Sequence, residues 1–535
     1  MIDFARCFER VIAMDEIVKK LRAAYDAAPY KSESYQQSHP DRLAVVAALA
    51  GMRALDIESC RVLEIGCASG GNLIPMAEQL PRSRLLGIDL SERQIETGST
   101  LVRELGLTGI ELRCQDLMLF PADEGPFDYI IAHGVYSWVT GPVQQRLLKI
   151  CRDHLAPRGV AYISYNAYPG WHCAEITREL MLFHARNDVD QTARAARGRE
   201  IVKFAAVHTL DNNIYRALLG SLGSSIASGS DDFILHDHME EVNEPKYFRQ
   251  FIDEIKAQGL AYVGDTGWNS FPWIRVPEPV REMIWKMCND SLDREQYLDF
   301  LTKRTFRGSV ICRAEDAVVA RAPPAHRFGA LHVAGNPRSA PAGINPQGRP
   351  ALKFRAEGDH EVVISDPRLL AMLRHLCGAW PSTVPIAELQ RVFDNQPPPV
   401  HDLKDKSSEL DRVIDAYYQL GLIELWTRPM STIARTPGRF PRTTRYARRQ
   451  ASDNLIVTSL RHVQINPDDS MRQLISLLDG TRDSNAIANE LVNRNQAAVK
   501  SVWPSKDPEK IQPLVESSLK RVAELSLLIN EAEPP

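Results

Sequence analysis

The chain has 535 residues, of which 44% are hydrophobic and 25% charged, as is usual for soluble globular proteins. At about 100 to 200 residues per domain, this length predicts roughly three domains and excludes a single small binding module. The 64 Lys and Arg residues against 68 Asp and Glu residues give a net charge of -4, so no global positive field marks a dedicated nucleic-acid binder.

The cysteine pattern and the apolar runs indicate the compartment. The nine cysteines include no C-x-x-C pair, which favours reduced thiols over a disulfide framework or a zinc site. No stretch approaches the roughly 18 consecutive apolar residues of a membrane helix. We therefore expect a cytoplasmic protein that binds no metal and has neither an export signal nor a membrane span.

Strand and helix patterns alternate from residue 61 to residue 165. Amphipathic stretches of helix length separate the apolar runs RVLEIG, RLLGIDL, IELRCQD, FDYIIAHG and GVAYISY. This rhythm predicts βαβ units in an α/β fold, with a parallel sheet covered by helices on both faces.

The alternation is interrupted twice before the sheet is complete. Residues 174–235 and 268–305 read as helical insertions, whereas residues 260–263 and 309–313 read as further strands. The sheet domain is therefore expected to span residues 1–315.

The remaining chain divides into two smaller units. Between residues 322 and 350 the composition shifts to Pro, Gly and Ala, which predicts a linker or an extended crossover at a domain boundary. Three helices and a closing strand, IELW, make residues 316–430 typical of a small winged-helix-like α+β module. Residues 431–535 contain two short amphipathic helices joined by an Asp-Gly-Thr turn, which predicts a second winged-helix-like module.

The segment VLEIGCASGGNL, residues 62–73, predicts a cofactor site. It reads as a strand, an acidic residue, a loop of small residues and a helix, with Glu64, Gly66, Ala68 and Gly70 spaced as E-x-G-x-A-x-G. Small residues let the backbone approach a nucleotide-like ligand, and the N–H groups at the helix N-terminus can bind a carboxylate.

Two cofactors compete for this loop. A dinucleotide fingerprint, G-x-G-x-x-G, requires a second glycine where Ala68 stands, and only one βαβαβ half is evident. An acid at Glu64 would repel a pyrophosphate but can pair with the ammonium group of an amino-acid tail. This difference favours S-adenosylmethionine.

Acidic residues also end the next two predicted strands. Asp89, with the adjoining Leu90, can accept hydrogen bonds from ribose hydroxyls, and Asp116, beside Gln115, can accept from an adenine amino group. Because ligands in open α/β sheets bind at the carboxyl ends of the strands, these side chains are expected to converge on Glu64. Each element also has a structural alternative, since the two aspartates could cap helices or turns and the glycines could form a tight connection.

These motifs resemble those of class I S-adenosylmethionine-dependent methyltransferases. The segments DAAPYKSESYQQSHPDRL, HGVYSWV, SYNAYPGWH and LLDGTRD further resemble bacterial methyltransferases that carry a methyltransferase regulatory domain, a family that includes lysine methyltransferases of outer-membrane proteins. The resemblance implies a Rossmann-like core, a regulatory segment near residues 225–310, a helical insertion that mediates dimerisation and further domains that position a protein substrate.

The resemblance also implies active-site residues after the fourth and fifth strands. His133, Tyr136 and Trp138 follow the fourth strand, and Asn166 follows the fifth. Aromatic rings there can line a narrow acceptor channel, although Trp138 could instead pack under a loop. His133 is expected to contact the cofactor, His133 or Tyr136 to take a proton, and Asn166 to accept a hydrogen bond from the attacking amine. Tyr30 is expected to fold over the cofactor, with a surface arm as the alternative.

Three functions stay open at this point. The first is a protein lysine methyltransferase whose substrate is an outer-membrane or secreted protein before export. The second is a small-molecule methyltransferase, and the third is a non-catalytic protein that senses the cofactor. Nucleic acid is not expected as a partner, although the arginine-rich residues 428–449 could dock nucleic acid or an acidic protein as well as form an interdomain loop.

Overall fold

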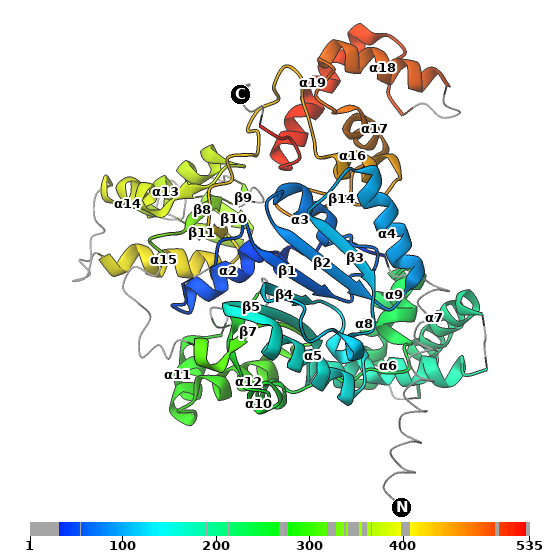
Figure 1. The fold of residues 1–535 in the computed structure, drawn as a ribbon, viewed down its shortest axis with the longest axis vertical. Helices are drawn as coiled ribbons and strands as arrows, with labels where there is room; N and C mark the ends of the chain where they lie inside the picture. Colours follow the sequence, from blue (N-terminus) through cyan, green and yellow to red (C-terminus); the bar gives the residue numbers. More distant parts are fainter. Residues whose placement is uncertain are drawn as a thin grey trace, which may run out of the picture.

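The structure is a computed structural model of the chain. It describes residues 31–53, 55–187, 190–210, 214–266, 273, 276–317, 328–335, 339–340, 352–355, 361–364, 366–396, 407–497 and 502–530. Figure 1 shows a central sheet with helical layers, one smaller unit to its left and a C-terminal unit above it. Within these ranges, no helix combines the length and the apolar character needed to cross a membrane.

The central sheet is mixed and has seven strands in the order β3-β2-β1-β4-β5-β7-β6. Strands β1 to β5 pair in parallel, whereas β7 runs antiparallel to β5 and β6. The strands are β1 (Arg61–Ile65), β2 (Arg84–Asp89), β3 (Ile110–Cys114), β4 (Phe127–Ala132), β5 (Leu155–Asn166), β6 (Leu260–Asp265) and β7 (Phe306–Arg313). This arrangement confirms the predicted Rossmann-like sheet, including its two late strands.

Helices cover both faces of the sheet and form two hydrophobic cores. Those of the first core are α2 (Pro40–Leu49), α3 (Leu73–Gln79) and α4 (Glu92–Glu104), and those of the second are α5 (Gly141–His154) and α10 (Phe248–Ala257). Val62 of β1 belongs to the first core and Leu63 to the second, because successive side chains of a strand point to opposite faces. Short 3-10 turns are η1 (Gln36–Ser38), η2 (Leu117–Leu119), η3 (Tyr136–Trp138) and η7 (Ala314–Asp316).

Both predicted helical insertions are present. The first comprises α6 (Gly170–His184), α7 (Gln191–His208), α8 (Ile214–Ser228), α9 (Asp231–Phe233) and a π-helical turn, η4 (Ile234–His238), which share a small core of their own. The second comprises α11 (Glu278–Met287) and α12 (Ser291–Thr302). Arg307 of β7 ties α12 to the sheet, because its buried guanidinium pairs with both Asp265 and Asp299.

The middle unit combines three helices with small sheets. Its elements are β8 (His332–Gly335), β9 (Ser339–Ala340), β10 (Leu352–Arg355), β11 (Glu361–Ile364), α13 (Pro367–Ala379), β12 (Val384–Pro385), α14 (Ile386–Asp394), α15 (Ser407–Gln419) and β13 (Ile423–Trp426). The predicted linker at residues 322–350 is wrong at β8, which is the central strand of the β12-β8-β13 sheet. Four residues carry too weak a pattern to predict a strand, and β8 is stabilised by its pairing with distant β13.

The C-terminal unit contains the two predicted helices and adds a hairpin and further helices. Its elements are α16 (Arg445–Ser452), β14 (Val457–Thr458), β15 (Gln464–Ile465), α17 (Asp469–Leu477), α18 (Ser484–Ala497) and α19 (Pro508–Glu524). Arginines of the stretch at 428–449 bind the C-terminal unit to the sheet domain. Nε of Arg445 lies 3.6 Å from Oε1 of Glu78 in α3, and Arg449 pairs with Glu104 of α4. These contacts fit the interdomain alternative for the stretch.

Candidate active site

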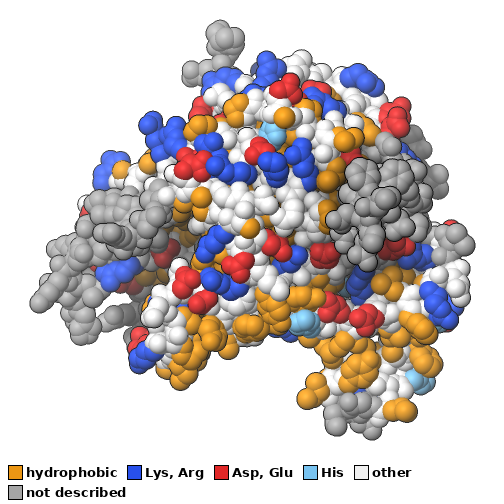
Figure 2. All heavy atoms as spheres, turned by 60° about the horizontal axis from the view of Figure 1, so that its bottom comes forward, with side chains coloured by type: hydrophobic (Ala, Val, Ile, Leu, Met, Phe, Trp, Pro, Cys, Tyr) orange, Lys and Arg blue, Asp and Glu red, His pale blue; other side chains and the backbone are white. Residues whose placement is uncertain are grey.

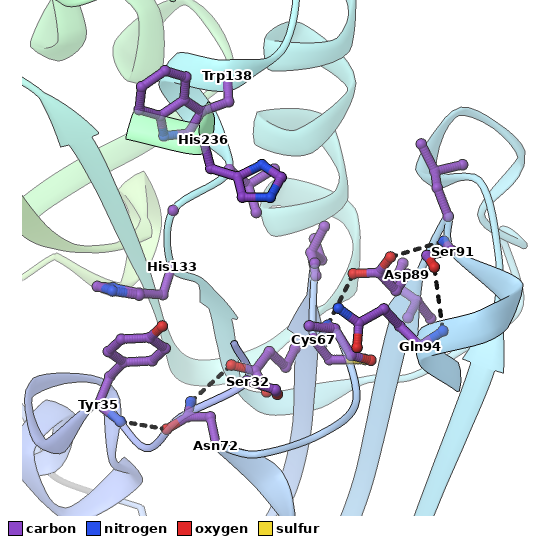
Figure 3. A pocket seen from close by; sticks show the side chains of 18 of the residues that line it. Ser32, Tyr35, Cys67, Asn72, Asp89, Ser91, Gln94, His133, Trp138 and His236 are labelled. Atoms are coloured by element: carbon purple, nitrogen blue, oxygen red, sulfur yellow. Dashed lines mark hydrogen bonds between the residues drawn. The ribbon is translucent and has the colours of Figure 1, made fainter. Parts of the chain in front are cut away.

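A cavity of about 270 Å³ lies at the carboxyl edge of the sheet (Figure 3). The loops after β1, β2, β3 and β4 line it, together with the N-terminal segment 31–35, the turn η4 and the start of β7. Open α/β sheets bind their ligands at this edge. The predicted site residues that line the cavity are Glu64, Gly66, Ala68, Asp89, Leu90, Gln115, His133, Trp138 and Asn166.

The loop after β1 needs small residues for both conformation and space. Gly66 has a φ of +75°, and a Cβ atom there would lie 2.5 Å from Cγ2 of Val135. A Cβ atom on Gly71 would lie 2.2 Å from the carbonyl oxygen of Ser32, so the N-terminal segment rests directly on the loop. The glycines therefore form a tight connection, as the structural alternative held, and this connection also forms one wall of the cavity.

Glu64 presents an unsatisfied carboxylate oxygen at the cavity. The side chain is 3% exposed, and its Oε1 accepts a hydrogen bond from Nδ2 of Asn72 at 2.7 Å. Its Oε2 is buried and has no hydrogen-bond partner among the residues that the structure describes. Burial raises the pKa of Glu64 to about 8. An orphaned acceptor of this kind fits the ammonium group of an amino-acid tail, which donates, so the residues present suit S-adenosylmethionine.

Asp89 supports the loop as well as lining the cavity. Its Oδ2 accepts the N–H of Ala68 at 2.9 Å, and its Oδ1 accepts the N–H of Ser91 at 2.9 Å. The N-cap of α4 is Ser91 and not Asp89, because the Ser91 hydroxyl accepts the N–H of Gln94. Each oxygen of a carboxylate has two lone pairs, so Asp89 can still accept hydrogen bonds from ribose hydroxyls.

Two predicted cofactor contacts, Asp116 and Gly70, do not line the cavity. Asp116 caps η2, where its Oδ1 accepts the N–H of Met118 at 2.8 Å, so the capping alternative describes it. Gln115 lines the cavity in its place. Gly70 faces the packed side chain of Leu112, and Tyr30 lies outside the described residues.

Trp138 and His133 also form parts of the cavity wall. The ring of His133 lies against that of Tyr35, tilted by 35° with 3.8 Å between ring centroids, and its Nδ1 lies 3.1 Å from the hydroxyl of Tyr162. Burial lowers the pKa of His133 to about 4, so the imidazole is neutral near pH 7. Trp138 packs edge-on against Trp171 with centroids 6.0 Å apart.

Tyr136 does not occupy the place that the sequence suggested. Its side chain is fully buried between Phe251 and Tyr165, and its hydroxyl donates to the carboxylate of Glu254. The prediction that Tyr136 walls the acceptor channel is therefore corrected. In the 3-10 turn η3, Tyr136 turns toward the core under α10, while Trp138 lines the cavity.

Asn166 lines the cavity from the end of β5. Its Nδ2 donates to Oδ1 of Asn243 at 2.9 Å, which fixes the side-chain amide and leaves its oxygen for other donors. Acceptance of a hydrogen bond from the attacking amine by this oxygen stays a prediction.

The sequence did not single out several residues of the wall. These are Ser32, Glu33, Tyr35, Asn72, His236, Asp237 and Phe306. The run HDHME around Asp237 was the one available chemical signal, but only the fold shows that the insertion returns η4 to the cavity. Burial raises the pKa of Asp237 to about 6.

Comparison with known families agrees with this geometry. Residues 62–159 match a methyltransferase domain, residues 230–313 a predicted methyltransferase regulatory domain and residues 440–527 the PKMT C-terminal winged helix domain. The sheet and its cavity thus define an S-adenosylmethionine-dependent methyltransferase domain. The chain belongs to the family of methyltransferases that carry the regulatory domain and the PKMT winged helix.

Two relatives and one solved structure show the extent of the likeness. RP028 of Rickettsia prowazekii is 33% identical over 244 residues, which are 45% of this chain and 97% of RP028. RP789 of the same organism is 38% identical over 291 residues, which are 54% of this chain, and the match spans only 52% of RP789. PKMT2 from Rickettsia typhi in complex with AdoHcy matches with a TM-score of 0.81 and 26% identity, over 94% of this chain and 100% of that one.

Proposed function

We propose that the protein transfers the methyl group of S-adenosylmethionine to lysine side chains of a protein substrate. The observation that carries the proposal is the chemistry of the cavity, whose wall combines an orphaned carboxylate oxygen of Glu64 with aromatic rings and a second carboxylate, that of Asp237. The likeness to AdoHcy-bound PKMT2 over almost the whole chain and the PKMT winged-helix match support the same function.

The second end of the cavity suits a lysine side chain. Asp237 offers a carboxylate that can pair with the incoming ammonium group, and the amide oxygen of Asn166 can accept one of its hydrogens. The rings of Trp138 and Phe306 line the same space. Aromatic faces attract cations and cover the aliphatic part of the side chain, so this end is matched to a long chain with a terminal amine.

The chain's residues prepare the reaction mainly by placement. When bound, S-adenosylmethionine supplies an electrophilic methyl group that a neutral amine can attack in line. A lysine must first lose a proton, because its usual pKa is about 10.4. Asp237 and the neutral His133 line the cavity and are the groups that can take this proton. Alignment and exclusion of water by the aromatic walls supply the remaining catalysis.

Transfer of labelled methyl groups in a cell lysate tests the proposed acceptor. The purified chain is incubated with labelled S-adenosylmethionine and lysate, and modified peptides are identified by mass spectrometry, with Asp89→Ala as the cofactor-site control. Methyl-lysine in proteins that is lost with the control variant supports the proposal. Label confined to small molecules supports the small-molecule alternative, and cofactor binding without any transfer supports the sensing alternative.

We also propose that the methyl acceptor is an outer-membrane or secreted protein, modified in the cytoplasm before export. The supporting observation is the cysteine pattern of the sequence, which contains no C-x-x-C pair and favours reduced thiols. Precursor proteins that retain their export signals and carry methyl-lysine would support this assignment. Methylation restricted to proteins without export signals would contradict it.

The first insertion supports a further proposal, a homodimer through α7 and α8. Large apolar side chains on these helices and on the connection between them are strongly exposed: Phe204 of α7 is 58% exposed, Ile214 of α8 is 84% exposed, and Leu210, which follows α7, is 99% exposed. Figure 2 shows apolar side chains gathered on the lobe that projects at the lower right, which these helices form. Such a surface is typical of a protein contact.

Ile214→Asp is expected to convert a dimer to a monomer in analytical ultracentrifugation, whereas Leu455→Asp, a control on another surface, leaves the mass unchanged.

A further inference from the structure

We propose that the C-terminal winged-helix domain completes the cofactor site, with His462 as a positioning residue that acts on Glu64 through Asn72. The inference rests on the proposed binding of S-adenosylmethionine at Glu64. It assigns a role in cofactor affinity to a residue that lies 398 positions away from that carboxylate in the sequence, a separation obtained from their numbers, 462 and 64.

Asn72 connects the C-terminal domain to the carboxylate. Nε2 of His462 donates to Oδ1 of Asn72 at 2.7 Å, and the same oxygen accepts the N–H of Tyr35 at 2.9 Å. Nδ2 of Asn72 donates to Oε1 of Glu64 at 2.7 Å and to the hydroxyl of Ser38 at 3.0 Å. The amide therefore uses both acceptor sites and both donor hydrogens, which fixes its orientation.

This orientation decides which oxygen of Glu64 is available. Because Asn72 occupies Oε1, the buried Oε2 is the oxygen left without a partner among the described residues. Without His462, the Asn72 amide keeps its hydrogen bonds with Tyr35, Ser38 and Glu64 but loses one of its two acceptor contacts, so it can tilt toward the space that the imidazole leaves. The Glu64 carboxylate would then no longer be held with Oε2 placed to accept a hydrogen bond from the ligand ammonium.

His462 is held in a conformation suited to this contact. It is 1% exposed and has a φ of +60°, a left-handed conformation that is uncommon for a residue with a side chain. Its ring lies 5.2 Å from that of His39 at the start of α2. Burial lowers the pKa of His462 to about 3, so the ring is neutral and one nitrogen carries the donated proton. Its other nitrogen, Nδ1, is buried with no hydrogen-bond partner in the part of the chain that the structure describes.

The hairpin that carries His462 also holds the N-terminal wall of the cavity. The hydroxyl of Thr458 in β14 lies 3.1 Å from that of Ser34, and Nε2 of Gln464 in β15 donates to the carbonyl oxygen of Ser34 at 2.8 Å. The neighbouring Ser32 accepts the N–H of Gly71 at 2.7 Å and lines the cavity. Figure 3 shows Ser32, Asn72 and Tyr35 grouped at this end of the pocket. The C-terminal domain thus reaches the cofactor site by two routes.

Domain docking does not depend on His462 alone. Arg461 pairs with Glu424 of the middle unit, and Arg449 pairs with Glu104 of the sheet domain. A change at residue 462 can therefore alter the network at Glu64 while the domain stays in place. His462→Ala therefore tests the positioning of Glu64. Arg449→Ala is the matched control, because it removes a docking contact that does not reach Glu64.

The test measures the dissociation constant of S-adenosylhomocysteine by calorimetry with the full chain. We expect His462→Ala to weaken binding roughly tenfold, His462→Gln to recover most of the affinity because its amide can donate to Asn72, and Arg449→Ala to change it less than twofold. An unchanged dissociation constant for His462→Ala would overturn the proposal. So would a loss that glutamine does not recover, because that result indicates a structural role.

A double-mutant cycle with Glu64→Gln tests whether His462 affects cofactor affinity through Glu64. If His462 acts through Glu64, the substitution at 462 costs little further affinity once Glu64 is replaced. Full additivity of the two losses overturns the proposed route. Failure of the wild-type chain to bind S-adenosylhomocysteine would contradict the proposed function itself, so the two failures are distinguishable.

Discussion

The two ends of the cavity are built in different ways. The cofactor end comes mainly from two short stretches, residues 64–72 and 89–94, whose side chains and backbone are closely hydrogen-bonded to one another. The proposed acceptor end would take Trp138, Asp237 and Phe306, which line the cavity from three distant parts of the chain. The cofactor end can therefore be recognised from local spacing, whereas the acceptor end exists only after the insertions have folded.

The largest expected effect is at the cofactor end. Asp89→Ala removes the acceptor for two loop N–H groups and for the ribose, so the dissociation constant of S-adenosylmethionine should rise roughly 100-fold, or about 2.7 kcal/mol. Asp116→Ala is the matched control, because Asp116 caps η2 and does not line the cavity. Calorimetry checks both variants. Equal losses for the two would contradict the assignment of the cofactor end.

Asp237→Asn tests the acceptor end without changing the cofactor end. The substitution keeps the shape of the side chain but removes the charge that pairs with a lysine ammonium. We expect kcat/KM for methyl transfer to fall roughly 30-fold, about 2 kcal/mol, with the cofactor dissociation constant within twofold of wild type. A parallel loss of cofactor affinity would show that the two ends are not independent.

A smaller effect, with a characteristic pH dependence, is expected at Glu64. Its pKa of about 8 means that the carboxyl is mostly protonated at pH 6 in the ligand-free protein, whereas a ligand ammonium favours the ionised form. Cofactor binding therefore displaces a proton, and affinity should rise roughly tenfold from pH 6 to pH 7.5. Glu64→Gln should bind roughly tenfold more weakly at pH 7.5 and lose this dependence. Calorimetry at three pH values measures it, and a flat wild-type profile would contradict it.

The smallest catalytic effect is expected for Tyr136→Phe. The hydroxyl of Tyr136 donates to Glu254 within the second core and does not line the cavity. Its loss should lower the free energy of unfolding by about 1 to 2 kcal/mol, since the Glu254 carboxylate keeps a partner in Lys246, while kcat/KM stays within twofold. Denaturant unfolding and steady-state kinetics measure the two quantities. A large fall in kcat with unchanged stability would restore Tyr136 to the active site.

The fold could be predicted where periodicity is strong and pairing is local. The alternation at residues 61–165 was sufficient for β1 to β5, and the later strands β6 and β7 also matched their patterns. Strand β8 was missed because His332–Gly335 is a strand by virtue of its pairing with β13, about 90 residues away in sequence.

The site, like the fold, could be predicted only where local sequence places its residues. Glu64 and Asp89 are placed by the strands that carry them, so their spacing was informative. Tyr136 and Trp138 are two residues apart in a 3-10 turn, and only the packing of α10 decides which ring enters the core. Asp237 and His462 reach the site through tertiary contacts that no local pattern encodes.

A crystal structure of the full chain with S-adenosylhomocysteine tests the central claim, a single cavity that runs from the cofactor tail to the acceptor amine. The account predicts the amino group of the ligand within hydrogen-bond distance of Oε2 of Glu64, its ribose at Asp89 and its sulfur directed toward the end formed by Trp138 and Asp237. A ligand whose amino-acid tail lies elsewhere, with Oε2 of Glu64 still unpaired, would contradict it.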